Sequence, residues 1–212
     1  MTPLKRVLDL CVVLVAGVIL ALPFALVVVA VLVTQGRPLF YVSERMKSPG
    51  QPFRLWKLRT MSAVAGDSGV SGGDKRDRVT PVGRILRRIR FDEVPQLWNV
   101  LRGDMSFVGP RPPLRQYTER FPEIYGEVLK SRPGVTGLAS LHFHRHEEHL
   151  LGRCATAAET DDVYVRRCIP RKARLDLIYA RRRNVCTDIA LMYRTLVAAL
   201  GGRRRARRRR FR

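Results

Sequence analysis

Two adjacent carboxylates, Asp92 and Glu93, stand in an otherwise strongly basic stretch of the chain. A carboxylate is a weak nucleophile and is repelled by an anionic substrate, but both obstacles shrink where a divalent metal and basic side chains neutralise the negative charge. The pair also suits a structural role, with Asp92 as a helix N-cap and Glu93 as a first-turn acid that the helix dipole favours. Taken alone, the pair leaves both interpretations open, and the structural one is the simpler.

Several residues before and after this pair in the chain are candidates for holding a phosphate. Arg111 lies in the segment GPRP, where its two flanking prolines fix the backbone and Gly109 allows close approach. Arginine can hold a phosphate in bidentate fashion. The full candidate set is Lys57, Arg59, Arg87, Pro110, Arg111 and Arg132. For Arg132, in RPGVTG, a contact with nucleotide or phosphate and a purely structural turn are equally good interpretations.

The whole chain is basic. Its 40 Lys and Arg against 18 Asp and Glu give a formal charge of +22, and much of the excess is arginine in the last ten residues. Such an excess calls for an anionic partner, which can be nucleic acid, anionic lipid or a phosphorylated substrate. The four cysteines form neither a disulfide framework nor a zinc-ligand spacing, which fits a reducing, cytosolic setting for the soluble part. We expect three further arginines to face solvent or lipid headgroups: Arg84, Arg88 and Arg90.

An uncharged run of residues covers 11–33. As a straight helix it would measure roughly 35 Å, enough to cross a bilayer core of about 30 Å. Pro23 lies at its midpoint, where it removes a backbone hydrogen bond and bends a helix. Basic residues flank both ends, so the positive-inside rule gives no orientation for a span. From this segment alone, a re-entrant helix–bend–helix hairpin and a single kinked span are equally good interpretations.

Local signals predict the elements that would position these side chains. Two alternating stretches within 36–61 predict a β-hairpin with its turn at 48–51. Residues 62–77 are rich in Gly, Ser and Asp and should form a loop, either a linker or a lid. Thr80 followed by Pro81 predicts the start of a basic helix. Three more helical stretches are expected, from Asp92 to Gly103, over 115–130 and, as two amphipathic helices, over 160–200.

Two further groups of titratable residues attract notice. His142, His144 and His146 alternate, as on one face of a strand, and the fourth histidine, His149, completes no HExxH motif. We therefore favour an exposed strand or a substrate-facing loop over a metal site. Asp176 can either order the last helices or contact the active site, and the structural role is favoured.

Four segments, taken together and in this order, resemble the bacterial sugar transferase family of phosphoglycosyl transferases. They are PFRLWKLRTM, the block RVTPVGRILRRIRFDEVPQLWNVLRGDMSFVGPRP, RPGVTGLA, and LDLIYARRRNVCTDI. The resemblance covers the chain except for the arginine tail and residues 140–160. At this length the chain is similar to the small, monotopic members, which favours the re-entrant form of the N-terminal segment.

The resemblance implies an activity and roles for residues. Asp92 would attack the β-phosphate of a UDP-sugar, expel UMP and form a phosphosugar–aspartyl intermediate, which polyprenyl (undecaprenyl) phosphate then attacks. Glu93 would be the Mg²⁺ ligand, because Mg²⁺ commonly takes one or two carboxylates together with phosphate oxygens. Among the basic candidates, the active site is favoured for Lys57, Arg87 and Arg111. Membrane lipids are expected partners, specific nucleic acid is not, and a homo-oligomer stays open.

These inferences define the expected architecture. The fold is α+β and helix-dominated, with a re-entrant membrane helix hairpin in 1–35. A compact cytosolic catalytic domain, 36–200, contains a small β-hairpin and amphipathic interface helices. The basic tail, 201–212, has too few apolar residues to pack, and disorder is expected. The location implied is the cytoplasmic face of a bacterial plasma membrane. The alternative function is a membrane-anchored protein that binds nucleic acid or another polyanion, for which no recognition module is present.

Overall fold

Strands β1 (Phe40–Ser48) and β2 (Gln51–Leu58) form an antiparallel hairpin, which confirms the prediction from the alternating stretches. The computed structural model describes residues 2–62 and 69–208, with side chains as far as 198. Gly50 makes the turn with a φ of 71°, a conformation that glycine adopts without strain. Phe53, Leu55 and Leu58 of β2 are buried, so one face of the hairpin contributes to the core.

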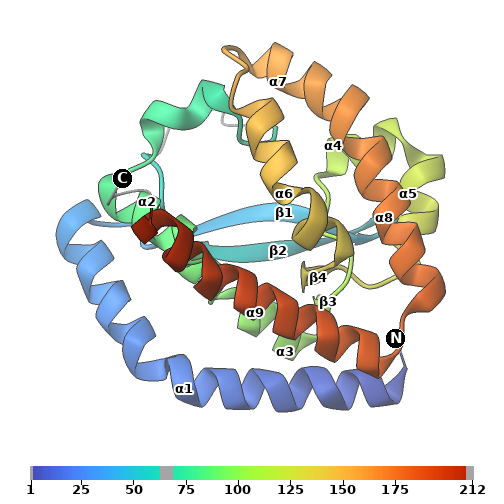
Figure 1. Cartoon of the computed structure of the whole chain (residues 1–212), viewed down its shortest axis with the longest axis horizontal. Coiled ribbons are helices and arrows are strands. Elements are labelled where there is room, and N and C mark those ends of the chain that lie inside the picture. The colour runs from blue at the N-terminus through green and yellow to red at the C-terminus, as the bar shows by residue number, and fades with distance from the viewer. Residues whose placement is uncertain (1, 63–68, 209–212) are drawn as a thin grey trace.

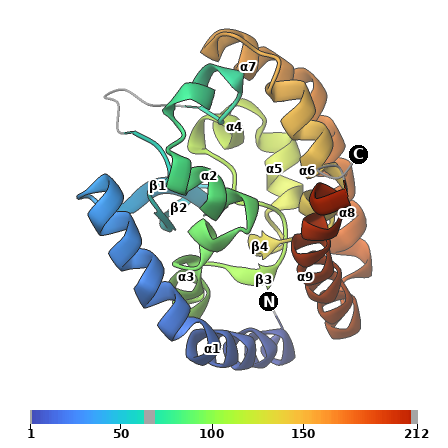
Figure 2. The ribbon, with the colours of Figure 1, turned by 60° about the vertical axis from the view of Figure 1, so that its left-hand side comes forward.

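Helices dominate the rest of the described chain, so the α+β prediction holds (Figure 1). In chain order the other elements are α1 (Pro3–Gln35), the 3₁₀ helix η1 (Gly73–Arg78), α2 (Pro81–Arg88), the 3₁₀ helix η2 (Phe91–Glu93), α3 (Gln96–Arg102), β3 (Ser106–Val108), α4 (Arg115–Arg120), α5 (Pro122–Val128), β4 (Gly134–Thr136), α6 (Leu138–Leu151), α7 (Ala157–Val163), the π-helix η3 (Tyr164–Cys168), α8 (Ile169–Arg182) and α9 (Val185–Arg208). Figure 2 shows α6, α8 and α9 grouped on one side of the strands.

A short parallel pair joins the two loop segments RPGVTG and GPRP. Strand β3 pairs with β4, with Ser106 opposite Gly134 and Val108 opposite Thr136. Glycine is needed here because a Cβ on Gly109 would lie 2.1 Å from the carbonyl oxygen of Arg132. The two segments therefore touch along their backbones, which fixes where the GPRP loop leaves β3.

Three predictions about the helices need correction. Residues 142–146 lie within α6 and not on a strand, because α6 buries Ala139, Phe143 and Leu151 on one face at helical spacing. The stretch 115–130 is two short helices, since Pro122 cannot continue the helical hydrogen bonding of α4. The expected loop 62–77 ends in η1 at Gly73, and residues 63–68 lie outside the described part.

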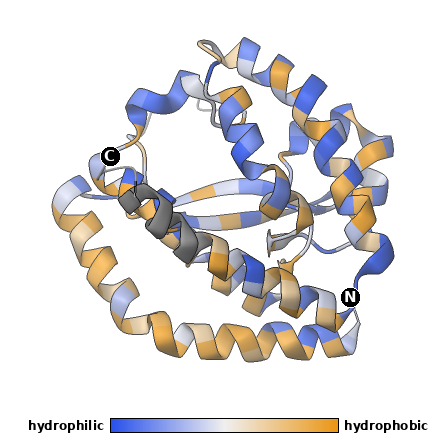
Figure 3. Ribbon diagram, viewed as in Figure 1, coloured by the Kyte–Doolittle hydropathy of each residue, from blue (hydrophilic) through white to orange (hydrophobic). Residues whose placement is uncertain are grey.

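Helix α1 is one continuous helix of 33 residues, long and apolar enough by length and composition to cross a membrane. Its ribbon bends part-way along (Figure 1), and most of its residues are hydrophobic, with polar ones at its two ends (Figure 3). Pro23 lies inside it, and a proline inside a helix bends it by removing a hydrogen bond. A hairpin of two separate helices is not seen, so the re-entrant arrangement stays a prediction.

The beginning of α1 is attached to the rest of the protein by a buried ion pair. The Lys5 ammonium lies 2.5 Å from Asp188 of α9 and also donates to the Tyr179 hydroxyl, at 3.2 Å, and to the Val108 carbonyl, at 3.0 Å. Tyr179 in turn donates to Asp188, at 2.7 Å. These contacts join α1, β3, α8 and α9 at one point.

A second attachment lies one turn further along α1. The buried Asp9 carboxylate accepts hydrogen bonds from the Ser106 hydroxyl, at 3.0 Å, and from the Phe107 backbone, at 3.1 Å. Both donors belong to β3, the strand that leads into the GPRP loop. The apolar helix and the loop bearing Arg111 are therefore held in one rigid arrangement.

We expect Lys5→Met to destabilise the protein by about 3 kcal/mol, because removing one partner of a buried pair leaves Asp188 as an uncompensated charge. The measurement is thermal or denaturant unfolding of the detergent-solubilised protein. Lys130→Met is the matched control, since the Lys130–Glu127 pair is exposed and should contribute less than about 1 kcal/mol. Equal effects of the two substitutions would contradict the anchoring role of Lys5.

The predicted domain boundary at 200/201 falls within α9, whose backbone continues as a helix to Arg208. Residues 209–212 of the predicted disordered tail lie outside the described part of the chain.

Candidate active site

The acidic pair lies on a tight turn between two helices. Thr80 caps α2 by accepting from the Gly83 backbone at 2.9 Å, as its position before Pro81 predicted. After α2 the chain reverses at Arg90, whose φ of 60° is a left-handed conformation that costs a non-glycine residue about 1 kcal/mol or more. The 3₁₀ helix η2 follows, and it carries both carboxylates on its last two residues.

Asp92 is not the N-cap of the next helix, contrary to the simplest interpretation of the sequence. Helix α3 begins only at Gln96, after Pro95. Val94 and Pro95 both keep right-handed helical dihedral angles, but the turn that carries Asp92 is the 3₁₀ helix η2, which ends at Glu93 before α3 begins. Gly103, with a φ of 81°, ends α3 as predicted. The two carboxylates are therefore buried on a turn without serving as a helix cap.

Glu93 is the centre of a buried ion cluster. Its Oε1 accepts from Lys57 and from Arg111, each at 2.9 Å, and its Oε2 lies 3.3 Å from Arg90. Burial alone would raise the pKa of Glu93, but the charges of Lys57, Arg111 and Arg90 hold that pKa well below its usual value. Glu93 is thus ionised, and its charge also raises the pKa of Arg111.

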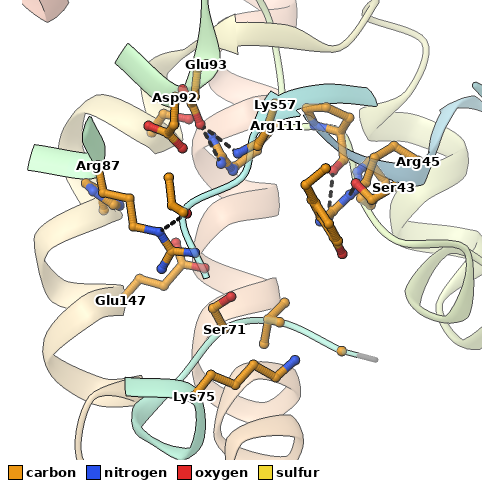
Figure 4. Close-up of a pocket in the computed structure, with 18 of the residues that line it drawn as sticks. Ser43, Arg45, Lys57, Ser71, Lys75, Arg87, Asp92, Glu93, Arg111 and Glu147 are labelled. Carbon is orange, nitrogen blue, oxygen red and sulfur yellow. Dashed lines mark hydrogen bonds and ion pairs between the residues drawn. The ribbon is translucent and has the colours of Figure 1, made fainter. Parts of the chain in front are cut away.

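Asp92 is buried beside this cluster but takes no part in it. Within the described residues, no hydrogen bond or ion pair engages its carboxylate, although the side chain is only 7% exposed. Burial raises the pKa of Asp92, with Lys57 opposing that rise and the neighbouring Glu93 adding to it. Figure 4 shows the carboxylate facing the same space as Arg87 and Arg111. An acid held without partners next to cations is available to a ligand.

Three of the predicted phosphate partners meet at one cavity of about 470 Å³ that Asp92 and Glu93 also line. Lys57 comes from β2, Arg87 from α2 and Arg111 from the GPRP loop. Arg87 is oriented by donating from Nε to the Thr60 hydroxyl at 2.8 Å. That contact requires α2 to lie against the chain just after β2. The approach is close enough to need a glycine at position 83, because a Cβ there would lie 2.1 Å from the Thr60 carbonyl oxygen.

The other three predicted phosphate partners do not direct their polar groups into the cavity in the same way. Arg59 lines the cavity, but its guanidinium donates to the carbonyls of Gln35, Gly36 and Arg37 and so closes the C-terminal end of α1. Pro110 and Arg132 do not line the cavity. The Pro110 carbonyl accepts from the Gly134 backbone at 2.8 Å, and the Arg132 guanidinium lies beside Gly103. In this structure both belong to the support of the GPRP loop.

The cavity also contains side chains that the sequence did not single out. Arg45 of β1 lines it, and so do Glu147 of α6 and Lys172 of α8. His144 lines it from α6, whereas no group of three or more His, Cys, Asp or Glu residues in the described chain could hold a metal ion by itself. These residues come from elements far apart in the sequence, so no local pattern groups them. For Glu147 and His144, the helical spacing of apolar residues in 138–151 could have predicted that both lie on one helix.

Asp176 also lines the cavity, although the structural role was favoured from the sequence. Burial raises the pKa of Asp176 to about 7, and only Lys172 opposes that rise appreciably. A buried acid in a cavity with a strongly raised pKa is a candidate for function on physical grounds. Asp176 therefore belongs with the site.

We expect the raised pKa of Asp176 to make stability depend on pH. The favourable contribution is complete below the unfolded-state pKa near 4 and is lost as the pH rises through about 7, amounting to about 4 kcal/mol at most. Asp176→Asn should therefore unfold at a higher temperature than the unaltered protein at pH 8, and the gap should narrow strongly by pH 5 and close near pH 4. The exposed Asp162→Asn is the control. A gap that does not change with pH would contradict the raised pKa.

The donor set is compatible with Mg²⁺ that arrives with a diphosphate. Mg²⁺ prefers one or two carboxylates and fills its remaining positions with phosphate oxygens and water. A carboxylate offers about four lone-pair sites. The contacts to Lys57, Arg111 and Arg90 use three of those on Glu93, which leaves one on Oε2, and Asp92 is not engaged by described residues. The pair can thus supply two carboxylates to one ion.

Taken together, the fold and site define a protein with a long apolar N-terminal helix fixed against a cavity in which a free carboxylate faces Lys and Arg side chains. These features are typical of a membrane-associated site for phosphorylated ligands. The chain belongs to the bacterial sugar transferase family, whose model matches residues 1–202.

The names of several similar proteins are consistent with this family. The chain is 46% identical over 121 residues to a putative undecaprenyl-phosphate N-acetylgalactosaminyl 1-phosphate transferase of Bacillus subtilis, covering 56% of this chain and 66% of the relative. It is 38% identical over 169 residues to a UDP-glucose:undecaprenyl-phosphate glucose-1-phosphate transferase of Klebsiella pneumoniae, covering 76% of this chain and 36% of the relative. It is 35% identical over 150 residues to the exopolysaccharide production protein ExoY of Sinorhizobium fredii, covering 63% and 66%. The chain thus spans between about a third and two thirds of the length of these relatives.

Proposed function

We propose that this protein transfers a phosphosugar from a UDP-sugar to polyprenyl (undecaprenyl) phosphate, releasing UMP and starting the assembly of a lipid-linked glycan. The observation that carries the proposal is the unengaged, buried carboxylate of Asp92 beside a Glu93 that is already neutralised by three cations. The names of the relatives, which specify undecaprenyl phosphate and sugar 1-phosphates, support the same reaction.

In the first half-reaction, an Asp92 oxygen attacks the β-phosphorus of the donor. A bond forms between that oxygen and phosphorus, the bond from phosphorus to the oxygen of UMP breaks, and UMP leaves with the bonding electrons. Arg87, Arg111 and Lys57 bind the phosphate oxygens and reduce the repulsion between the carboxylate and the diphosphate. The raised pKa of Asp92 reflects a desolvated carboxylate, and loss of solvation makes a carboxylate a better nucleophile.

In the second half-reaction, a phosphate oxygen of the polyprenyl phosphate attacks the phosphorus of the aspartyl adduct. The new bond gives a polyprenyl diphosphosugar, and the Asp92 carboxylate leaves and is regenerated. The same cations serve both half-reactions, because each passes through a phosphorus centre bonded to Asp92.

Glu93, together with Asp92, is the proposed ligand for Mg²⁺. When bound, the ion supplies positive charge to the diphosphate and to the leaving UMP. The role of Glu93 in the protein itself is to hold Lys57 and Arg111 in place at the cavity wall.

The acceptor enters from the bilayer. We propose that α1 enters and leaves the membrane on its cytoplasmic face, since basic residues flank both of its ends and the helix bends (Figure 1). The exposed apolar residues of α9, among them Ile189, Tyr193 and Leu196, then lie at the interface, where the many arginines attract anionic lipids. This places the catalytic domain in the cytoplasm.

The test is release of UMP when the purified protein is mixed with Mg²⁺, undecaprenyl phosphate and one of a panel of UDP-sugars. Release that requires both donor and acceptor for multiple turnovers is the expected result. No release with any donor, together with tight salt-dependent binding of nucleic acid by a protein lacking 203–212, would replace the proposal with polyanion binding.

A further inference from the structure

The cavity has a second wall, opposite in chemical character to the cation cluster. This wall is formed by α6, η3 and α8. Four polar residues from these elements line the cavity: Glu147, Tyr164, Lys172 and Asp176. We call these four residues the acidic wall. Glu147 is labelled in Figure 4, where its side chain reaches into the space faced by Arg87. None of the four takes a part in the phosphate chemistry proposed above.

Asp176 is the residue that points to a ligand. Its side chain is 6% exposed, and its Oδ1 has no hydrogen-bond partner among the described residues. A buried polar atom without a partner destabilises the folded protein, so such atoms are rare and call for an explanation. A hydroxyl or amide donor on a bound ligand would complete the hydrogen bonding of this oxygen.

The other three residues form a connected network. Lys172 donates to Glu147 Oε1 at 2.8 Å and to the Tyr164 hydroxyl at 3.2 Å. Its ammonium also lies 4.9 Å from the centre of the Tyr164 ring. Lys172 therefore holds Glu147 in position through this hydrogen bond. Among the four residues of the acidic wall, two carboxylates face one ammonium group. This balance disfavours a second phosphate and favours a neutral ligand rich in hydroxyl groups.

We propose that the acidic wall is the subsite for the glycosyl moiety of the donor, with Asp176 and Glu147 accepting hydrogen bonds from its hydroxyl groups. The proposal rests on the proposed function and assigns the sugar end of the substrate within it. Ribose hydroxyls of the nucleotide have the same chemistry. The sugar is favoured because the phosphosugar stays in the cavity through both half-reactions, whereas UMP leaves after the first.

The wall would then set sugar selectivity. Epimeric sugars differ in the direction of one hydroxyl, and a site built to bind a hydroxyl rejects an analogue that leaves its polar groups unpaired. Lys172, on this view, positions Glu147 and does not bind sugar directly. The relatives described above are named for different sugars, glucose and N-acetylgalactosamine, which fits a subsite that distinguishes sugars.

The test compares steady-state kinetics of Glu147→Gln and Asp176→Asn with those of the unaltered protein. Donors would be UDP-glucose, UDP-galactose and their two N-acetylated counterparts, and UMP would be the product inhibitor. We expect kcat/KM for the preferred donor to fall about 10- to 100-fold, as for one lost hydrogen bond to a charged group. The ratio between epimeric donors should change, and the inhibition constant of UMP should stay within about twofold. Asp162→Asn, outside the cavity, should change none of these.

Three other results would contradict the sugar subsite or the proposed function. A loss that is equal for all donors, with the epimer ratio unchanged, would overturn the subsite. A parallel weakening of UMP inhibition would assign the wall to ribose and equally overturn it. Both variants should fold, Glu147→Gln because Glu147 is partly exposed and Asp176→Asn because it removes a buried carboxylate, and thermal unfolding checks this. Failure of the unaltered protein to release UMP with any donor would instead refute the proposed function, and the subsite with it.

Discussion

Asp92→Asn is expected to lower turnover by about 10⁴-fold or more while the protein stays folded and still binds the donor. The amide has nearly the shape of the carboxylate but lacks the charged oxygen that would bond to phosphorus, and losing a nucleophile has effects of this size. Since burial raises the pKa of Asp92, ionising this group is unfavourable in the folded state. Asp92→Asn should therefore be at least as stable as the unaltered protein. The measurements are UMP release and thermal unfolding.

Asp104→Asn is the matched control for this substitution. Asp104 is a partly buried aspartate paired with Lys47 and Arg102, at 3.7 and 3.6 Å, and it does not line the cavity. Its replacement should leave turnover within about twofold. Comparable activity of Asp92→Asn and Asp104→Asn would remove Asp92 from the chemistry.

Glu93→Gln is expected to have the second-largest effect, and on two properties at once. Lys57 and Arg111 would lose the only charged partner that the described residues give them, which should destabilise the protein by about 3 kcal/mol. Turnover should fall by about 100-fold or more, because the two cations would no longer be held at the phosphate position and a Mg²⁺ ligand would be lost. Unfolding in detergent and UMP release measure the two effects.

A double substitution separates these effects. Glu93→Gln combined with Lys57→Met removes the unpaired ammonium and should recover part of the stability but none of the activity. Glu44→Gln is the control, because the Glu44–Arg115 pair, at 2.7 Å, is exposed and exposed ion pairs contribute little to stability. If Glu93→Gln were as harmless as Glu44→Gln, the ion cluster would have no structural role.

Features set by neighbouring residues in the chain were predictable from the sequence. The hairpin follows from alternation and from a Pro-Gly turn, the start of α2 from Thr80 and Pro81, and the end of α3 from Gly103. In each case the signal and the structure it determines lie within a few residues of one another. The grouping of Lys57, Arg87 and Arg111 around the acidic pair was also anticipated, but the resemblance to the family supported it more than any local pattern did.

Features set by long-range packing were not predictable in this way. The alternating histidines suggested a strand, but burial of Phe143 and Leu151 against α8 makes this stretch a helix. For Arg132 the sequence left a phosphate contact and a structural role open, and the β3–β4 pair places its guanidinium beside Gly103. Arg59 was expected to face phosphate, and its contacts with the end of α1 depend on how a distant helix packs.

The site departs from locally favourable structure at two places, and both border the cavity. Arg90 adopts a left-handed conformation directly before η2, and Asp176 is a buried carboxylate with an unpartnered oxygen. Each destabilises the folded protein, and such features concentrate where function requires them. Stabilising substitutions at either place should therefore reduce activity, a trade-off that the pH dependence of Asp176→Asn makes measurable.

The most direct test of the account is the intact mass of the protein after incubation with Mg²⁺ and a productive UDP-sugar in the absence of acceptor. We predict a mass increase equal to one sugar phosphate less one water, located on the peptide that contains Asp92, absent from Asp92→Asn and lost when undecaprenyl phosphate is added. Formation of the lipid-linked product without any such adduct, under conditions that preserve acyl phosphates, would contradict the covalent mechanism.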